Sequence, residues 1–410
     1  MFPVSRHVRN VVFLIEHKNS TMEQIMSKVR PKALIIGASY AGLVAAAALR
    51  ANNWHATILE RSTERLRTGG GVVVQKRMME YLTDRGLGLP GITGIPAHTR
   101  KIFQPDGTTL SMPETAAAYT SWDVLLRQLE RTVGNDNIRR GVSMVDIPDW
   151  GFSGDVVLSD GTTQHGDVII AADGIGSLTR QQLLPGIVPT YAGYVAWRGM
   201  VDEEDLSAET IRTFADSLSS YPGKRTVIVL YEIPGADGAT ASGKRRINWV
   251  WYENVPDREE LHDILTDSQA TRHRSTMPRG LMRDAIKERM HRIAEEDLPT
   301  PFAEVVMKTK EPFVQTIDDL TIPRLVFGRV VLIGDAASLV RPHIGSGTAK
   351  AVDDAILLAH ALSNGCDEDL NCLAAWEYTR LEVHAGMAEY SRAVARRLGL
   401  GTDKGNKEHL

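Results

Sequence analysis

The order of apolar and polar residues predicts a strand–helix–strand unit near the start of the chain. Residues 33–36 and 56–59 are short apolar runs with β-branched members, which is typical of buried strands. An alanine-rich stretch at residues 43–49 lies between them and has the small side chains of a helix that packs closely on a sheet. This order predicts a βαβ unit over residues 32–60.

Two further strands of this kind are predicted at residues 168–171 and 330–333. Like the first strand, each is followed by a glycine-containing segment, and these segments lie at residues 37–42, 172–180 and 334–337. In open α/β sheets, ligands bind at the carboxyl ends of the strands. The three segments therefore predict one extended ligand with phosphate, ribitol and ring portions.

The middle of the chain has a different pattern. Long β-like runs occur at residues 226–231 and 247–252, and polar helices are predicted from about residue 258 to residue 292. Alternation within the second run places Trp249 and Trp251 on one face of a strand. We interpret these two side chains as core packing, with an aromatic wall against a ligand as the alternative.

These patterns predict an α/β fold with an α+β substrate domain. A Rossmann-like cofactor domain is interleaved with a β-sheet substrate domain, and helices close the chain. Ser121 is predicted to cap an amphipathic helix that ends near Gly134. The predicted organisation is an N-terminal extension (1–30), a discontinuous cofactor domain (31–110, 120–185 and 325–365), a substrate domain (186–324), C-terminal helices (366–400) and a disordered tail (401–410).

The composition excludes some classes of protein and changes little else. The chain has 410 residues, of which 43% are hydrophobic and 24% charged, and its formal net charge is −4. This balance is ordinary for a soluble globular protein and gives no reason to expect a nucleic-acid partner. No apolar run approaches the roughly 20 residues that a membrane span needs, so we expect no membrane partner.

The cysteines and the first thirty residues bear on location. Cys366 and Cys372 have neither the spacing of a redox pair nor companions for a metal site. We therefore expect no metal, two structural thiols and a reducing, cytoplasmic location.

Residues 1–30 are interpreted as an irregular extension or as the product of a start codon placed too early. A targeting peptide is the alternative, although Glu16 and Glu23 fit it poorly.

The first glycine segment has two of the three glycines of a dinucleotide fingerprint. Gly37 permits a tight turn, and Gly42 permits close contact between helix and strand. Ser39 takes the middle position and is small enough for the backbone to approach a pyrophosphate at the helix start. Glu60 follows at about the 20-residue distance expected of an acid that binds ribose hydroxyls. This segment alone does not distinguish NAD from FAD.

The other two segments carry a family resemblance. Residues 173–180 read Asp-Gly-x-x-Ser-x-x-Arg, and residues 334–350 begin Gly-Asp-Ala-Ala and contain the turn Gly345-Ser346-Gly347. With these motifs the chain resembles, from about residue 32 to 395, the flavin-dependent aromatic hydroxylases typified by para-hydroxybenzoate hydroxylase, the group A flavoprotein monooxygenases. It departs from the family at three positions, where Ser338, Ala349 and Trp122 replace its frequent His, Asn and Arg or Gln. Several phrases are most similar to dihydroxypyridine hydroxylases: residues 121–123, 191–199, 248–252 and 341–343.

The resemblance implies an activity. The chain would be a single-component monooxygenase that binds FAD non-covalently and uses NADH or NADPH and O₂ as co-substrates. It would hydroxylate a small, electron-rich aromatic or N-heteroaromatic ring, hydroxypyridine- or phenol-like, through a flavin C4a-hydroperoxide, and it would form a homodimer. No second dinucleotide fingerprint is present, which favours transient docking of the nicotinamide.

The resemblance also implies site residues. Asp335 would bind the ribitol chain, and the turn at residues 345–347 would open a helix against the flavin pyrimidine, where backbone N–H groups stabilise negative charge. The second motif is associated with both FAD and the nicotinamide donor. The residues expected to bind the cofactor are Gly37, Ser39, Tyr40, Ala41, Gly42, Glu60, Arg61, Gln75, Trp122, Asp173, Gly174, Arg180, Asp335, Pro342, Gly345, Ser346 and Gly347.

Three residues are the catalytic candidates. His343 directly precedes the flavin-facing turn, and a histidine near neutral pKa suits a base or a hydrogen-bond partner for a substrate hydroxyl. The alternative is a histidine that packs or binds backbone. Tyr194 and Arg198 are expected to orient an anionic or hydroxylated ring, with sheet packing as their alternative.

Two other functions stay open at this point. The same fold can serve an epoxidase or an oxidative tailoring enzyme that acts on a larger secondary metabolite. A non-oxygenase nucleotide-binding oxidoreductase would use only the Rossmann-like core. A flavin halogenase is disfavoured, because the first glycine turn lacks that family's lysine and residues 249–253 read Trp-Val-Trp-Tyr-Glu.

Overall fold

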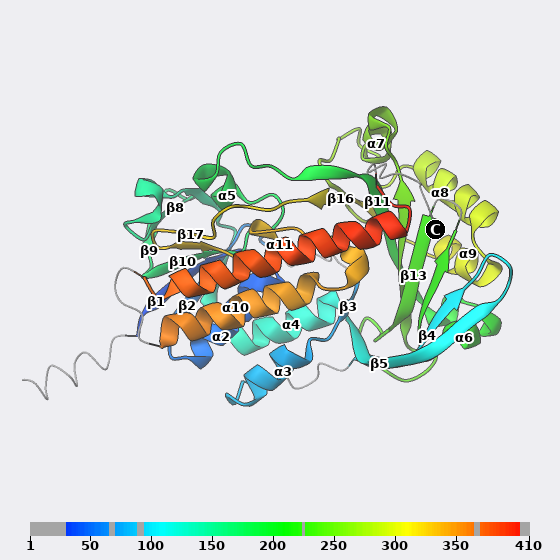
Figure 1. Cartoon of the computed structure of the whole chain (residues 1–410), viewed down its shortest axis with the longest axis horizontal. Helices are drawn as coiled ribbons and strands as arrows, with labels where there is room; N and C mark the ends of the chain where they lie inside the picture. The colour runs from blue at the N-terminus through cyan, green and yellow to red at the C-terminus, as the bar shows by residue number, and fades with distance from the viewer. Residues whose placement is uncertain (1–29, 65–69, 88–93, 224–225, 365–369, 402–410) are drawn as a thin grey trace, which may run out of the picture.

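The computed structural model describes residues 30–64, 70–87, 94–223, 226–364 and 370–401 (Figure 1). A six-stranded sheet forms the first layer, and its strands are parallel except for the antiparallel β17–β18 edge. The strand order is β17 (Val326–Phe327), β18 (Val330–Leu332), β10 (Val168–Ala171), β1 (Lys32–Ile36), β2 (His55–Glu60) and β6 (Ile138–Arg140).

A layer of helices covers this sheet. The helix α2 (Tyr40–Ala51) connects β1 and β2, so the predicted βαβ unit is confirmed. Its alanines are buried, because small side chains let the helix lie close to the sheet and to α4 (Trp122–Val133) and α10 (Gly347–Ser363). The helix α11 (Leu373–Arg397) packs against α10, and Figure 1 shows the two side by side.

The predicted boundaries of α4 are correct, and so is its N-cap residue, but the capping hydrogen bond is not made by the side chain. Ser121 is the N-cap residue and Gly134 ends the helix with a φ of 85°. However, the Ser121 hydroxyl is buried and caps no backbone N–H. The Trp122 amide, the first of the helix, donates instead to the Gly70 carbonyl, which ties the helix start to the neighbouring strand segment.

A nine-stranded mixed sheet forms the other end of the molecule (Figure 1). Its order is β15 (Thr276–Met277), β16 (Phe313–Asp319), β11 (Thr190–Asp202), β14 (Arg246–Asn254), β13 (Thr226–Ile233), β12 (Ser217–Pro222), β4 (Ile95–Phe103), β5 (Thr109–Ser121) and β3 (Gly71–Val73). The strands β3 and β4 therefore belong to the same sheet as the strands of the predicted substrate domain. This differs from the predicted domain division, in which residues 31–110 belonged to the cofactor domain. Strands that are distant in the sequence pair here, so membership of a sheet does not follow the order of the chain.

One face of the nine-stranded sheet packs against helices. Phe214 from α6 (Ala208–Phe214), Met290 from α8 (Asp284–Asp297) and Phe302 from α9 (Thr300–Met307) share a core with the sheet. Trp249 and Trp251 are fully buried in this core, and Trp249 Nε1 donates to Thr309 Oγ1 at 2.8 Å. Their interpretation as core packing is confirmed, and the ligand-wall alternative is excluded.

The remaining elements are small. A three-stranded sheet, β7 (Met144–Asp146), β8 (Asp155–Leu158) and β9 (Thr163–His165), lies beside α5 (Leu178–Leu183). The helices α3 (Lys76–Thr83) and α7 (Arg258–Ile264) are surface elements, and every helix in the described ranges is too short or too polar to cross a membrane. Cys372 is disulfide-bonded, so the expected free thiol is wrong for this residue. Cys366, residues 1–29 and the tail from 402 lie outside the described residues.

Candidate cofactor and substrate site

The three glycine-containing segments meet at one edge of the six-stranded sheet. They follow β1, β10 and β18, which are adjacent and parallel, so their carboxyl ends lie together. Gly37 has a φ of +105°, and a Cβ at this position would lie 2.6 Å from the Ala172 carbonyl oxygen. Only glycine fits this turn, and the first and second segments are in direct contact through it.

The start of α2 is open to a ligand. Ser39 is its exposed N-cap residue, and the hydroxyl makes no capping hydrogen bond. A Cβ at Gly42 would lie 2.0 Å from the Gly37 carbonyl oxygen, which explains the close approach of helix and turn. The Glu60 carboxylate accepts hydrogen bonds from the Ala38 amide at 2.7 Å and the Ser62 amide at 2.8 Å. The acid expected to bind ribose thus sits directly at the glycine turn.

Some expected cofactor residues lie under the site instead of facing it. Tyr40 is buried, and its ring packs 5.3 Å from the ring of half-buried Trp122. The Tyr40 hydroxyl contacts the Met78 sulfur. Arg61 follows Glu60 at the surface and is exposed. Ala41 lies beside the third segment, because a Cβ on Gly334 would come within 2.7 Å of its methyl group.

The second segment satisfies its own polar groups. The Asp173 carboxylate accepts from the Ser177 hydroxyl at 2.6 Å and from the Thr179 amide at 3.2 Å. Arg180 is 1% exposed, and its guanidinium donates to the carbonyls of Ile175 and Ala336. Both side chains brace the turn, and their expected part in cofactor binding stays a prediction. Gly174 faces open space, where a Cβ would meet nothing within 4 Å.

The third segment presents a carboxylate without a partner. The Asp335 side chain is exposed and makes no hydrogen bond or ion pair with any described residue. Surrounding protein nevertheless raises its pKa above the usual value by desolvation, and nearby Lys350 opposes this effect. An exposed carboxylate that is also desolvated lies in a recess of the protein, not on its outer surface.

The turn before α10 is equally open. Gly345 has a left-handed φ of 65°, and a Cβ at Gly345 or Gly347 would meet nothing within 4 Å. The Ser346 hydroxyl bonds back to the Ile344 carbonyl and does not cap the helix. The first amides of this 17-residue helix are therefore free to face negative charge.

Two further expected residues lie around this helix start. The Gln75 side chain donates to the Thr348 hydroxyl at 3.1 Å, which joins the end of the β3 segment to the first turn of α10. Pro342 begins the short helical turn η5 (Pro342–Ile344) and is half-buried. Together, the free helix start fits the pyrophosphate of FAD, the open glycine turn fits its ring, and the unpartnered carboxylate fits its ribitol.

One face of β14 is directed toward the cofactor side of the molecule. It makes contacts there near both ends of the strand, but not in the middle. Near one end, the Asn248 side chain accepts from the Gly71 amide at 2.5 Å, and Arg246 lies 3.7 Å from Asp123 of α4. Near the other end, the Tyr252 and His343 rings pack edge to face at 5.8 Å.

Val250 is the residue on this face of β14 that lies between those contacts. Val250 and its register partners Arg198 on β11 and Val229 on β13 are only half-buried, although they occupy the middle of the sheet. Solvent therefore reaches the centre of this face. Two valines and one cationic side chain therefore form the partly exposed centre of this face.

Arg198 is that cation. It has no hydrogen bond or ion pair to a described residue, and its Nε is buried without a partner. Burial raises the pKa of Tyr252 to about 12, and Arg198 opposes this rise. Burial also raises the pKa of Tyr231, again with Arg198 as the opposing charge. A guanidinium beside two phenols, open on one side, is suited to bind an anionic or hydroxylated ring.

Tyr194 and His343 are brought into contact with each other. Tyr194 is fully buried, and its oxygen lies 3.0 Å from His343 Nε2. Arg341 also donates to the Tyr194 hydroxyl, and Asp319 holds Arg341 through two hydrogen bonds of 2.9 and 2.6 Å. A guanidinium can only donate, so the Tyr194 oxygen is the acceptor in that bond, while the tautomer of His343 decides which group donates between Tyr194 and Nε2.

This arrangement bears on the expectation that His343 acts as a base. Its Nε2 is occupied by the hydrogen bond with Tyr194, and Nδ1 is buried and has no hydrogen-bond partner among the described residues. Burial and the Arg341 charge lower the pKa of His343 to about 4. The imidazole is therefore neutral at physiological pH, and its role as a base stays a prediction.

Sequence reasoning missed several residues of this region. Alternation on β14 contained the signal for Tyr252, because it lies on the face opposite Trp249 and Trp251. Arg341 and Asp319 carried no such signal, since their ion pair joins the third segment to the end of β16.

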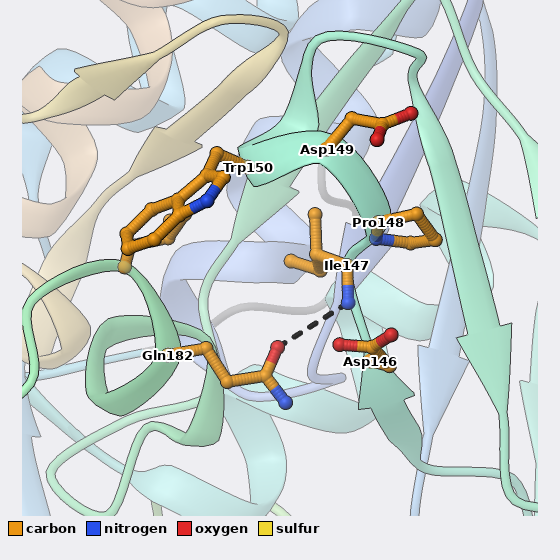
Figure 2. Close-up of a pocket in the computed structure, with 7 residues that line it drawn as sticks. Asp146, Ile147, Pro148, Asp149, Trp150 and Gln182 are labelled. Atoms are coloured by element: carbon orange, nitrogen blue, oxygen red, sulfur yellow. Dashed lines mark hydrogen bonds between the residues drawn. The ribbon is translucent and has the colours of Figure 1, made fainter.

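A hollow of about 280 Å³ also lies beside the three-stranded sheet (Figure 2). None of the residues expected to bind cofactor or substrate lines it; its walls include Asp146, Ile147, Trp150 and Gln182. The Gln182 side chain accepts from the Ile147 amide and donates to the Val145 carbonyl, so two hydrogen bonds hold it at the edge of the hollow. Figure 2 shows Trp150 on the opposite wall from Asp146.

Comparisons with known proteins give a consistent result. A family described as FAD binding domain-like matches residues 191–319. The chain is 31% identical over 374 residues to 2,6-dihydroxypyridine 3-monooxygenase of Paenarthrobacter nicotinovorans, covering 90% of this chain and 92% of the relative. It is 30% identical over 348 residues to aurachin C monooxygenase/isomerase of Stigmatella aurantiaca, covering 80% of each. The solved structure of 2,6-dihydroxypyridine-3-hydroxylase from Arthrobacter nicotinovorans matches with a TM-score of 0.84 at 30% identity, covering 92% of this chain and 96% of that one.

Proposed function

This chain belongs to the family of FAD-dependent aromatic hydroxylases, and we propose that its substrate is a small ring of the hydroxypyridine kind. The enzyme is an FAD-dependent monooxygenase that takes electrons from NADH or NADPH and oxygen from O₂. Similarity over nine-tenths of the chain to a dihydroxypyridine monooxygenase supports this substrate class over phenols and larger metabolites.

We propose that each part of the cofactor is bound by protein groups that have no partner within the described residues. The amides at the start of α2 near Ser39 would hold the pyrophosphate, and Asp335 would accept from the ribityl hydroxyls. The open turn at Gly345 and Gly347 would lie against the ring. When bound and reduced, FAD supplies the oxygen activation, and the protein's task is to orient the ring substrate and exclude water.

Arg198 carries the substrate proposal. A half-buried cation without a partner is costly unless a ligand supplies the opposite charge. An ionised ring hydroxyl provides that charge, and deprotonation makes the ring carbon more nucleophilic. Hydrogen bonds from a guanidinium favour the ionised form, so Arg198 would both position the substrate and activate it. Val229 and Val250 would contact the apolar part of the ring.

Tyr194 and His343 take a different role in this proposal. They tie the segment before the Gly345 turn to the substrate sheet, together with Arg341. The tie keeps the end of the substrate space closed, because Tyr194 is fully buried and Tyr252 packs against His343.

A substrate panel with an Arg198 variant tests the function. Hydroxypyridines, phenols and quinones are screened for accelerated NAD(P)H consumption and for a product that carries one added oxygen. For the best substrate, Arg198→Met should raise KM by about tenfold or more, since a charged hydrogen bond is worth about 1.5–3 kcal/mol. The FAD dissociation constant should not change.

The matched control is Arg212→Met on α6, an exposed arginine, which should leave KM as it is. An Arg198→Met enzyme with an unaltered KM for every active ring would refute the anchoring role. A panel in which only quinones or large polycyclic compounds are oxygenated would refute the hydroxypyridine class.

A further inference from the structure

The turn that carries Asp335 is held from behind by buried cations. The peptide carbonyls of Gly334 and Ala336 flank Asp335, and each accepts a hydrogen bond from a charged side chain. Lys350 Nζ donates to the Gly334 carbonyl at 2.7 Å, and Arg180 Nη1 donates to the Ala336 carbonyl at 3.0 Å. Both side chains are 1% exposed.

A buried aspartate completes this cluster. Asp354 Oδ2 accepts from the Gly334 amide at 3.1 Å and lies 3.7 Å from Lys350 Nζ. Its other oxygen accepts from Arg380 Nε and His384 Nε2, each at 2.8 Å, on α11. Although burial disfavours the charged form, Lys350 and His384 hold the pKa of Asp354 below its usual range. Both the amide and the carbonyl of Gly334 are therefore hydrogen-bonded to buried charged side chains.

Stability alone does not account for this arrangement. Buried ion pairs are commonly no better than apolar packing of the same volume, because desolvation offsets their attraction. Here Arg180 Nε, Arg380 Nη2 and His384 Nδ1 are buried without hydrogen-bond partners. Gly334 also adopts a left-handed φ of 62°. The cluster holds the turn in one unusual backbone conformation. In this conformation the Asp335 side chain points outward.

We propose that Lys350, Arg180 and Asp354 are positioning residues that aim the Asp335 carboxylate at the ribityl chain of FAD. The cluster acts through the Gly334–Ala336 turn and touches neither substrate nor cofactor. Lys350 also places a positive charge near Asp335, which favours its ionised form in the recess. This proposal depends on FAD binding and not on the identity of the ring substrate.

A double-mutant cycle on FAD affinity tests the proposal. Apoprotein is titrated with FAD for the unaltered chain, Lys350→Met, Asp335→Asn and the double variant, with flavin fluorescence as the readout. If Lys350 acts through Asp335, Lys350→Met should weaken FAD binding at least tenfold alone but less than twofold when Asp335 is already Asn. The apparent Tm of each apoprotein is recorded in parallel, because any loss of stability should occur in both backgrounds.

Lys310→Met is the matched control, since this exposed lysine pairs with Asp205 on the surface and should leave FAD affinity unchanged. If Lys350→Met does not fold, Lys350→Gln takes its place in the cycle, because it is shorter and uncharged but still polar. Equal losses of affinity in both backgrounds would overturn the proposal, as would full affinity in the single variant.

Discussion

The hydroxyl oxygen of Tyr194 lies within hydrogen-bond distance, 3.0 Å, of Nε2 of His343, although 149 positions separate the two residues in the chain. This hydrogen bond joins a strand of the nine-stranded sheet to the segment before the Gly345 turn. Arg341, held by Asp319, bonds the same Tyr194 hydroxyl. The pair therefore connects the nine-stranded sheet to the segment that follows the six-stranded sheet.

The first prediction concerns the acid stability of this connection. His343 has a pKa of about 4 in the folded protein, and an unfolded histidine has about 6.5. Between these values the unfolded chain binds a proton that the folded protein does not, so the stability contribution is lost as pH falls. The apparent Tm of apoprotein should fall more steeply from pH 6.5 to pH 4 than that of His343→Asn.

The exposed His55 provides the control for this measurement. His55→Asn should retain the steep fall in Tm over the same pH range. Identical pH profiles for the unaltered chain and His343→Asn would show that His343 is not held neutral by its surroundings.

A second prediction follows from the free carboxylate of Asp335. Asp335→Asn should keep the fold and weaken FAD binding by about tenfold or more, because charged hydrogen bonds contribute about 1.5–3 kcal/mol. Isothermal titration of apoprotein with FAD measures the change. Asp353→Asn is the control, since Asp353 pairs with Arg77 on the surface of α10. Unchanged FAD affinity in Asp335→Asn would remove the ribitol assignment.

A third prediction separates helix stability from ligand contact. Gly347 lies in the first turn of α10 and Gly386 in the middle of α11, and a Cβ would meet nothing at either position. Alanine is the better helix former, by up to about 1 kcal/mol, so Gly347→Ala and Gly386→Ala should each stabilise the apoprotein. Only Gly347→Ala should weaken FAD binding, because we propose that the flavin lies against the backbone only at Gly347 of these two positions.

Thermal unfolding and FAD titration of the two variants check this pair of effects. Equal FAD affinity in Gly347→Ala and Gly386→Ala would mean that the ring does not lie against the α10 start. The comparison needs no knowledge of the substrate.

The sequence predicted the parts of this molecule that are encoded locally. The strands that become β1, β10 and β18 are short apolar runs, and their glycine-rich ends had to meet once the sheet was parallel. Glu60 could be placed at the first turn by its distance from Gly37, and it does contact that turn through Ala38.

The sequence did not predict what depends on distant pairing or on the direction of a side chain. β3 and β4 join the nine-stranded sheet, whereas the predicted division placed them in the cofactor domain. Arg180 belongs to a motif associated with cofactor binding, but its guanidinium turns inward to the Ala336 carbonyl. A motif gives the residue type and spacing, and only packing decides which way a long side chain points.

A hydroxylase of this kind inserts one atom of O₂ into the ring, and isotope labelling detects that atom. The purified enzyme with FAD, NAD(P)H and the best hydroxypyridine is incubated under oxygen-18 gas, and the product is analysed by mass spectrometry. We expect one oxygen-18 atom per product molecule, with NAD(P)H consumed in equal amount. Steady NAD(P)H consumption that yields only hydrogen peroxide with every ring tested, and no labelled product, would show that the protein is not a hydroxylase of these rings.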